Sequence, residues 1–210
     1  QDDPDVDVVA INNRTPGNEQ LAYLYKYDTA HRTSKTKISY DDEGIIVKGK
    51  KIKTFAESEP SKLPWKELNI DVVLECTGAF TSKEACQGHL DAGAKHVIIS
   101  APAKDDTKTI VFGVNEKILE QSDQVISTAS CTTNCLAPVV KLIDDKYGVV
   151  KGFMTTVHAM TNDQETLDIA HKKGIYSRRG RAASQNIIPT STGAASQIGK
   201  VIPHLNGKMD

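Results

Sequence analysis

Short apolar runs recur along the first part of the chain, and polar turns separate them. Runs that are rich in Val and Ile and bounded by Asn, Gly or Ser predict buried strands. We expect strands at residues 6–11, 70–76, 96–100, 109–114 and 124–127. Residues 45–47 and 52–55 are also apolar, and the polar G-K-K between them predicts a hairpin at the margin of the sheet.

Apolar residues at three- and four-residue spacing predict helices between several of these strands. We expect helices at residues 21–27, 81–92 and 131–147, and a further helix that begins at residues 192–195. Thr81 and Glu84 fit a capping box at the start of the second helix, and Gly93 follows its last residue. Strands that alternate with helices are typical of a doubly wound α/β sheet with parallel strands.

Ligands of doubly wound sheets bind beyond the carboxyl ends of the strands. Three of these ends are Asn12-Asn13, Thr77-Gly78 and Ser100-Ala101-Pro102. Taken singly, each is most simply interpreted as a strand-to-loop turn. Together they are the place in the first part of the chain where a ligand is expected.

The pattern changes after the helix at residues 131–147. Residues 149–158 alternate between two sets of side chains, as a strand does, and a long polar loop follows to about Ser184. A short strand is predicted at residues 186–189. We therefore divide the chain into a first domain at 1–130, which carries the incomplete doubly wound sheet, and the start of an α+β domain at 131–210.

Composition and charge exclude several classes of function. The 210 residues are 39% hydrophobic and 25% charged, with a net charge of −1, so nothing favours nucleic acid or an anionic membrane surface. The arginines at 178, 179 and 181 lack interleaved aromatic residues, which also argues against nucleic acid. No apolar run is long enough to cross a bilayer, and the N-terminal Q-D-D-P-D is no signal peptide. Four cysteines without framework spacing predict a reducing, cytoplasmic compartment.

Residues 127–147 read S-T-A-S-C-T-T-N-C-L-A-P-V-V-K-L-I-D-D-K-Y and predict a reactive thiol at the start of a helix. Small residues before Cys131 suit a tight turn, and Gly148 follows the helix as a typical C-terminal residue. The unpaired N–H groups and the positive dipole end of a first helical turn favour an anion. We therefore expect the thiol of Cys131 to ionise readily and to act as a nucleophile.

These cysteines also allow other interpretations. A lone cysteine is often a small buried hydrophobe, but polar Ser130, Thr132 and Asn134 make a poor setting for core packing at Cys131. Cys135 lies beside the apolar face of the helix, and we assign it to packing. The C-x-x-x-C pair has no second Cys/His pair at ligand spacing, so no metal is expected.

Three segments resemble the glyceraldehyde-3-phosphate dehydrogenase family of bacterial type. They are S-C-T-T-N-C-L-A-P at 130–138, M-T-T-V-H-A-M-T-N-D-Q at 154–164 and A-A-S-Q-N-I-I-P-T-S-T-G-A-A at 182–195. The match runs in order from Val8 to Gly207. It implies a Rossmann-type dinucleotide-binding domain at 1–130 and the beginning of a catalytic domain at 131–210.

The resemblance implies a glycolytic oxidoreductase that converts D-glyceraldehyde 3-phosphate and inorganic phosphate to 1,3-bisphosphoglycerate. Cys131 would form a thiohemiacetal and then a thioester, and His158 would act as the base. The incoming phosphate is assigned to Ser130, Thr132, Arg181, Thr192 and Gly193, and the substrate phosphate to Thr161. Cofactor contacts are expected at Asn13, Arg14, Thr77, Gly78, Ser100 and Asn162.

The sequence departs from the family pattern in two respects. No glycine-rich G-x-G-x-x-G turn stands in the twelve residues before Asn13, and the family continues past Asp210, so we expect the chain to be part of a longer protein. The family has Asn-Asp and an apolar residue where this chain reads Asn12-Asn13-Arg14. Asn13 lacks the charge that repels a 2′-phosphate, and Arg14 can pair with one.

A second substitution agrees with this. Residues 167–170 read L-D-I-A, where NAD-specific members carry Leu-Pro after the Asp, so a wall against the extra phosphate is smaller. We therefore expect NAD as the cofactor, with NADP as an additional candidate.

Alternatives to the leading function come from three classes of protein. Erythrose-4-phosphate dehydrogenase shares the S-C-T-T-N-C stretch, although the unbroken T-S-T-G-A-A looks more like the glyceraldehyde enzyme. A non-catalytic surface-binding role and thiol–disulfide exchange between Cys131 and Cys135 are further alternatives. The resemblance also implies a cytoplasmic homotetramer, with neither nucleic acid nor a membrane as partner.

Overall fold

The computed structural model describes residues 3–14, 17–165, 170–180 and 183–210. The chain divides into two compact units. Unit 1 comprises Gln1–Lys108 with Gln121–Ser127, and unit 2 comprises Thr109–Glu120 with Thr128–Asp210. The assignment of residues 1–130 to cofactor binding and of residues 131–210 to catalysis stays a prediction.

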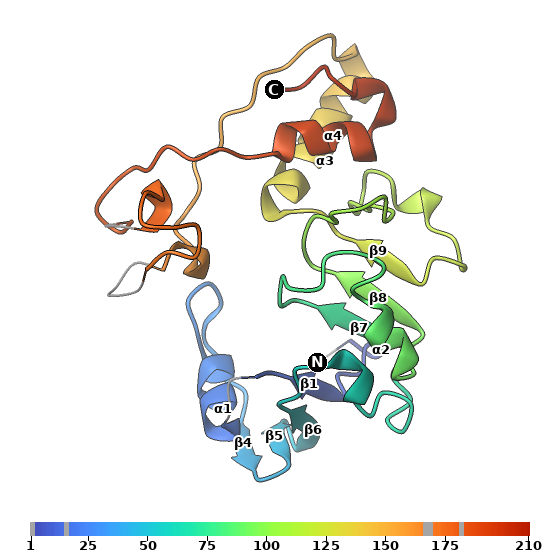
Figure 1. Cartoon of the computed structure of the whole chain (residues 1–210), viewed down its shortest axis with the longest axis vertical. Coiled ribbons are helices and arrows are strands. Elements are labelled where there is room, and N and C mark those ends of the chain that lie inside the picture. The colour runs from blue at the N-terminus through green and yellow to red at the C-terminus, as the bar shows by residue number, and fades with distance from the viewer. Residues whose placement is uncertain (1–2, 15–16, 166–169, 181–182) are drawn as a thin grey trace. The chain divides into compact units, whose positions relative to one another are not determined.

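Unit 1 contains a mixed four-stranded sheet with the order β1-β6-β5-β4 (Figure 1). Its strands are β1 (Ala10–Asn12), β4 (Ile38–Asp41), β5 (Gly44–Val47) and β6 (Lys50–Phe55). β1 runs parallel to β6, whereas β4, β5 and β6 pair antiparallel. Helix α1 (Asn18–Lys26) precedes a small hairpin formed by β2 (Tyr27–Asp28) and β3 (Arg32–Thr33).

The second sheet of unit 1 is parallel throughout, with the order β7-β8-β9. Its strands are β7 (Val72–Glu75), β8 (His96–Ile99) and β9 (Val125–Ser127), and the short helix α2 (Gln87–Asp91) lies between β7 and β8. A helix between two parallel strands is the βαβ unit, so the predicted α/β class is confirmed. The predicted sheet is divided, since β1 and β7 are edge strands of different sheets.

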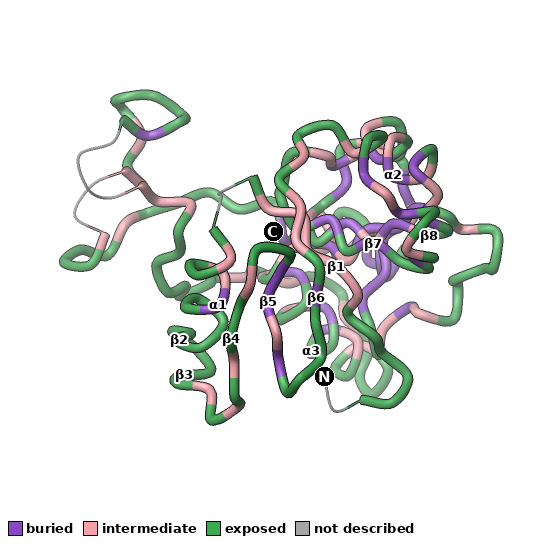
Figure 2. Tube along the Cα trace, turned by 90° about the horizontal axis from the view of Figure 1, so that it is seen from below, coloured by how far each residue is buried: buried purple, intermediate pink, exposed green. Residues whose placement is uncertain are grey.

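Two apolar clusters hold unit 1 together, and Figure 2 shows buried positions along β5 and around β7 and β8. One cluster joins Ala22 of α1 to Ile45, Val47 and Ile52 of the hairpin. The other surrounds Trp65 and includes the inward side chains of β7 and β8, with Val9, Ala10 and Phe55 packed against it. Burial of each Val or Ile side chain contributes about 1.5–3 kcal/mol relative to exposure.

Unit 2 is organised around helix α3 (Cys131–Tyr147), which Gly148 ends with a positive φ of 73°. Helix α4 (Ala194–Val201) packs on α3, since Ala137 and Val140 share a buried cluster with Ile198 and Val201. Short 3₁₀ helices complete the chain: η1 (Pro60–Lys62), η2 (Glu116–Ile118), η3 (Asn162–Gln164), η4 (Arg178–Gly180) and η5 (Pro203–Leu205).

Several sequence predictions agree with the structure. The hairpin at residues 45–55 is present, and Lys48-Gly49 at its turn both have positive φ, as a type I′ turn requires. Helices form at the predicted positions in α1, α3 and α4, although α1 and α4 have shifted ends. The helix predicted at 81–92 is regular only over Gln87–Asp91, and a turn precedes it in which the Ser82 hydroxyl accepts the Ala85 N–H at 3.1 Å.

Three predicted strands are wrong. At residues 109–114 the side chain of Asn115 bonds the Val111 N–H at 2.8 Å and the Thr109 carbonyl at 2.9 Å. It thus occupies backbone groups that a neighbouring strand would otherwise bond. Residues 149–158 form only an isolated bridge, Gly152 to Met209, and Val157 is 97% exposed. Residues 186–189 are irregular as well. β4 was not predicted, because its I-S-Y-D sequence has a single apolar aliphatic residue.

Two glycines with positive φ allow a matched test of this packing. A Cβ at Gly93, where φ is 104°, would lie 2.8 Å from Lys66 Cα, whereas a Cβ at Gly49, where φ is 82°, would contact nothing within 4 Å. We expect Gly49→Ala to cost about 1–2 kcal/mol of backbone strain and Gly93→Ala clearly more, through added steric overlap. Urea unfolding followed by the emission of Trp65, the single Trp, measures both. Equal losses would contradict the close contact at Lys66.

Candidate active site

The turn that precedes α3 places Cys131 at the first helical position. Ala129 is buried and has a φ of 60°, a left-handed conformation that a residue with a Cβ adopts at a cost. Ser130 is the N-cap, and its Oγ accepts the Thr133 N–H at 3.1 Å. The amide of Asn134 donates to the carbonyls of Thr128 at 2.6 Å and Ser130 at 2.9 Å. The turn is therefore held from both sides.

Cys131 and His158 lie in contact, although 27 residues separate them along the chain. Cys131 Sγ is 3.4 Å from His158 Nε2. His158 Nδ1 lies 2.7 Å from the carbonyl of Ala159, which is an acceptor only, so Nδ1 carries a proton and donates it. This bond leaves Nε2 to exchange a proton with the thiol of Cys131.

Both members of the pair favour their charged forms. The hydrogen bond with His158, helped by the hydroxyl and N–H of Thr132, lowers the pKa of the Cys131 thiol in spite of partial burial. The bond to the Ala159 carbonyl and the contact with Cys131 raise the pKa of His158. The positive charge of Arg179 acts to lower this pKa, but its effect is smaller. Both shifts favour the ion pair of a thiolate and an imidazolium, and the thiolate is the nucleophilic form of cysteine.

A capping box and two ion pairs hold the segment after His158. Thr161 caps η3 in a capping box, in which its N–H donates to Gln164 Oε1 at 2.7 Å, and Asn162 is the first residue of that helix. Asp163 bonds Arg179 Nη2 at 2.9 Å and also pairs with Lys172. These ion pairs tie the arginine-containing loop to η3.

A second helix start carries two further predicted residues. Gly193 is the N-cap of α4, and Thr192 Oγ1 accepts the Ala194 N–H at 3.2 Å. Predicted phosphate-binding Ser130 and Thr132 flank Cys131 at the start of α3. Helix starts of this kind present N–H groups to anions. Arg181, which was also predicted to bind phosphate, lies outside the described residues.

In unit 1, Thr77, Gly78 and Ser100 follow the carboxyl ends of the parallel strands β7 and β8. Gly78 has a φ of 72°, and a Cβ there would meet no atom within 4 Å. The Ser100 N–H donates to the Glu75 carbonyl at 3.0 Å, which extends the β7–β8 ladder by one residue. The predicted contacts at these two strand ends therefore share one sheet edge.

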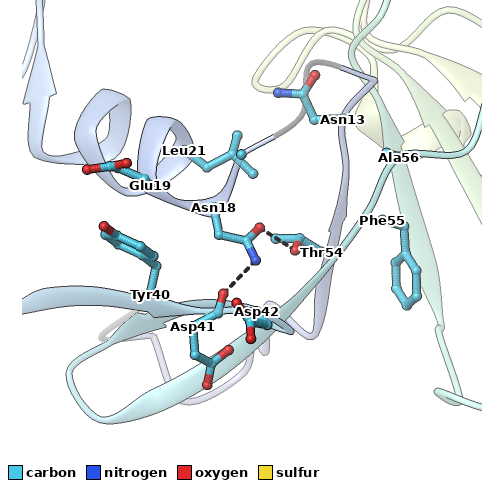
Figure 3. A pocket seen from close by; sticks show the side chains of 11 residues that line it. Asn13, Asn18, Glu19, Leu21, Tyr40, Asp41, Asp42, Thr54, Phe55 and Ala56 are labelled. Carbon is cyan, nitrogen blue, oxygen red and sulfur yellow. Dashed lines mark hydrogen bonds between the residues drawn. The ribbon is translucent and has the colours of Figure 1, made fainter.

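Asn13 and Arg14 follow β1, and Asn13 lines a cavity of about 400 Å³ between α1 and the mixed sheet (Figure 3). The side chain of Asn18 lines this cavity. Its Nδ2 donates to the Asp41 carbonyl at 2.7 Å, and its Oδ1 accepts the Thr54 hydroxyl at 2.6 Å. Arg14 is exposed. Three carboxylates also line the cavity: Glu19, Asp41 and Asp42.

Sequence reasoning missed the residues that orient the predicted ones. The Ala159 carbonyl fixes the His158 proton, the left-handed Ala129 shapes the turn, and Asn134 fastens it. Only Asn134 had a sequence signal, since an amide shortly after a helix start can bond the preceding turn. Among the described residues, no group of three or more His, Cys, Asp or Glu side chains could hold a metal ion. No described helix has the length and hydrophobicity for a membrane span.

Comparison with known proteins gives matches along the chain. Residues 1–83 match the family profile described as "Glyceraldehyde 3-phosphate dehydrogenase, NAD binding domain", and residues 130–210 match its C-terminal domain. Glyceraldehyde-3-phosphate dehydrogenases of Clostridium pasteurianum and Clostridium acetobutylicum are each 56% identical over 207 residues, which is 99% of this chain and 61% of theirs. That of Thermotoga maritima is 52% identical over 198 residues, 94% of this chain and 58% of its own. The chain thus spans about three fifths of the length of these curated relatives.

The Cys131–His158 pair predicts a specific pH dependence of alkylation. The thiolate forms as the pH rises through the pKa of Cys131, and this pKa is lowered. Iodoacetamide should therefore label Cys131 before the other cysteines, and the labelling rate should reach its maximum at a lower pH than that of an ordinary cysteine. His158→Asn removes the imidazolium and should move the midpoint to higher pH. Peptide mapping over a pH series measures this.

The control for this experiment is His204→Asn, since His204 belongs to the same unit but bonds Asp144 at 2.6 Å. It should leave the midpoint unchanged. Equal labelling of all four cysteines, or an unchanged midpoint in His158→Asn, would show that the pair does not activate the thiol.

Proposed function

The chain belongs to the glyceraldehyde-3-phosphate dehydrogenase family, and on this premise we propose that the protein oxidises D-glyceraldehyde 3-phosphate in the presence of inorganic phosphate. The product is 1,3-bisphosphoglycerate, and the electrons pass to a nicotinamide cofactor. The observation that supports this most directly is the 3.4 Å contact between Cys131 Sγ and His158 Nε2 at the start of α3.

The first step is addition of the Cys131 thiolate to the aldehyde carbon. A carbon–sulfur bond forms, and the carbonyl oxygen takes the proton of His158 Nε2, which leaves a thiohemiacetal and a neutral imidazole. The backbone N–H of Cys131 stands at the start of α3, where it has no partner within the helix and can donate to the developing oxyanion.

The second step is oxidation of this adduct. His158 Nε2 takes back the hydroxyl proton while the carbon loses hydride, and a thioester on Cys131 results. When bound, NAD supplies the acceptor for that hydride. The bond from Nδ1 to the Ala159 carbonyl keeps the imidazole in place for both proton transfers.

The third step is release of the acyl group. An oxygen of inorganic phosphate attacks the thioester carbonyl, the carbon–sulfur bond breaks, and the Cys131 thiolate is restored beside His158. We assign the incoming phosphate to Ser130, Thr132, Thr192, Gly193 and Arg181, and the substrate phosphate to Thr161. The capped starts of α3 and α4 support this assignment, because each presents hydroxyl and N–H groups suited to an anion.

The residues of unit 1 fit a dinucleotide. Residues 1–83 match an NAD binding domain, and the cavity beside Asn13 is of the size that holds a small ligand. The Asn13 amide can bond a ribose hydroxyl, and we assign Arg14, Thr77, Gly78 and Ser100 of unit 1 to further contacts. We also assign Asn162, which belongs to unit 2, to cofactor binding. The carboxylates that line the cavity disfavour an additional phosphate, so NAD fits better than NADP there. Arg14 and the uncharged side chain of Asn13 favour NADP, and the third feature predicted to do so, L-D-I-A at 167–170, lies largely outside the described residues.

Assembly and location belong to the same proposal. We infer a homotetramer in the cytoplasm, as the family relationship suggests. All four cysteines are free thiols, which fits a reducing compartment. Erythrose-4-phosphate oxidation and a surface-binding role have no observation in their favour, and a rate comparison of the two aldehydes separates the two dehydrogenase activities.

Omission of phosphate tests the thioester pathway. Without phosphate the thioester cannot be released, so we expect a burst of NADH that is stoichiometric with active Cys131, followed by a slow phase. Addition of phosphate should restore steady turnover. Rapid mixing with glyceraldehyde 3-phosphate measures the burst, and Cys131→Ser is the control that should show none. Steady turnover without phosphate, or a burst in Cys131→Ser, would rule the pathway out.

Cofactor choice is tested by Arg14→Ala and Asn13→Asp. If Arg14 pairs with a 2′-phosphate, Arg14→Ala should lower kcat/KM for NADP about tenfold and change that for NAD little. Asn13→Asp adds a repelling charge and should increase the preference for NAD. Steady-state kinetics with both cofactors measure this. An NAD preference already above roughly a thousandfold in the unmodified protein, about 4 kcal/mol, would rule out use of both.

A further inference from the structure

A buried carboxylate stands at the carboxyl end of β7. Glu75 is 4% exposed, and His89 connects it to Trp65 of the apolar cluster of unit 1. Its Oε2 is 3.1 Å from His89 Nε2, and its Oε1 accepts the Thr77 N–H at 2.7 Å. The Thr77 hydroxyl makes a second, shorter bond to the same Oε1. Both carboxylate oxygens are therefore occupied.

Donors and acceptors fix the protonation state of His89. Trp65 Nε1 lies 3.0 Å from His89 Nδ1, and an indole N–H can only donate. Nδ1 must therefore be an unprotonated acceptor, and the proton of the neutral ring lies on Nε2, where it is donated to Glu75. Phe80 packs edge-on against this imidazole, and Trp65 lies edge to edge with it through the hydrogen bond, in a nearly parallel plane, so the ring cannot readily turn.

A buried carboxylate without a paired cation is costly, and the hydrogen bonds offset that cost. Burial raises the pKa of Glu75, but the bonds from His89 and Thr77 outweigh it and hold the pKa below its usual value. The negative charge also raises the pKa of neighbouring Cys86, which burial has already raised, to about 11 in all. A Leu or Met of similar volume would avoid the cost altogether, so the carboxylate calls for an explanation.

The geometry connects this carboxylate to the strand ends assigned to the cofactor. The Thr77 hydroxyl donates to Glu75 and accepts the Ala79 N–H at 3.1 Å, so it fixes the turn on both sides of Gly78. The main-chain carbonyl of Glu75 accepts the Ser100 N–H at 3.0 Å. A single residue thus holds both Thr77 and Ser100.

We propose that Glu75 is a positioning residue for cofactor binding, which holds the Thr77-Gly78 turn in its binding conformation with His89 and Trp65 as its support. This inference rests on the proposed use of a dinucleotide in unit 1. The carboxylate accepts the main-chain N–H of Thr77 and so fixes the backbone immediately before Gly78, where a Cβ would meet no atom within 4 Å. The network ends at Trp65, so its state can be read from the emission of that residue.

The test uses Glu75→Gln and a Thr77 pair, with Kd for NAD measured by titration calorimetry. A glutamine side chain is not an adequate substitute for the carboxylate, because its NH₂ group would face donors, so Glu75→Gln should weaken NAD binding about tenfold or more. Thr77→Val removes the hydroxyl that bonds Glu75 and should also weaken it, whereas Thr77→Ser keeps the hydroxyl and should bind NAD more tightly than Thr77→Val does. KM for NAD should rise more than kcat falls.

Three controls separate positioning from general damage. Asp71→Asn removes an exposed carboxylate of unit 1, paired with Lys95 at 2.6 Å, and should leave Kd unchanged. The rate at which iodoacetamide labels Cys131 without cofactor should be unchanged in every variant, since that reaction needs unit 2 alone. Trp65 emission should change in Glu75→Gln but not in Asp71→Asn.

The possible outcomes test the positioning role of Glu75 separately from the proposed function. An unchanged Kd in a folded Glu75→Gln variant, when the unmodified protein binds NAD, would overturn the positioning role and leave the proposed function intact. No NAD binding by the unmodified protein would overturn both. If Glu75→Gln fails to fold, equal affinities of Thr77→Val and Thr77→Ser would overturn the proposal, and tighter binding by Thr77→Ser than by Thr77→Val would support it.

Discussion

The first N–H groups of an α-helix have no partner within the helix, and in α3 they meet a sulfur atom that the preceding turn holds in place. Ser130 takes up the N–H of Thr133, and Asn134 fastens the carbonyls on the other side of the turn. Ala129 accepts a left-handed conformation so that the chain can enter the helix directly. With Cys131 fixed in this way, His158 needs only one further bond, to the Ala159 carbonyl, to face the thiol with a defined proton.

The two units solve a similar problem in different ways. Each unit holds an ionisable group at the end of a helix or strand and supplies the hydrogen-bond donors that its negative charge requires. In unit 2 the charge is the thiolate of Cys131, which is accessible and reactive. In unit 1 it is the carboxylate of Glu75, which is buried, and its role is to hold Thr77. In both places the residue that we propose to contact a ligand is held by neighbours to which we assign no ligand contact.

The sequence allowed the elements with strong local signals to be predicted. Helix α3 was placed with both ends correct, because an apolar face, a polar start and Gly148 all agree. Strand prediction failed where pairing depends on distant partners. The alternation at residues 149–158 is that of a strand, yet the structure gives it only an isolated bridge, and a side chain, Asn115, replaces a strand partner near residue 111. The nucleophilic role of Cys131 was predicted from its position at a helix start, whereas the role of His158 came from family resemblance. The network at Glu75 could not be predicted from the sequence, because Trp65, His89 and Glu75 come together only through the fold.

The central claim is that Cys131 and His158 form a thiolate–imidazolium pair. The ultraviolet absorbance of the thiolate, recorded over a pH series as the difference between the unmodified protein and Cys131→Ser, tests this without any substrate. The account predicts a thiolate signal at pH values where an ordinary cysteine is still protonated, and a shift of that signal to higher pH in His158→Asn. A Cys131 thiolate that appears only in the ordinary range, with or without His158, would contradict it.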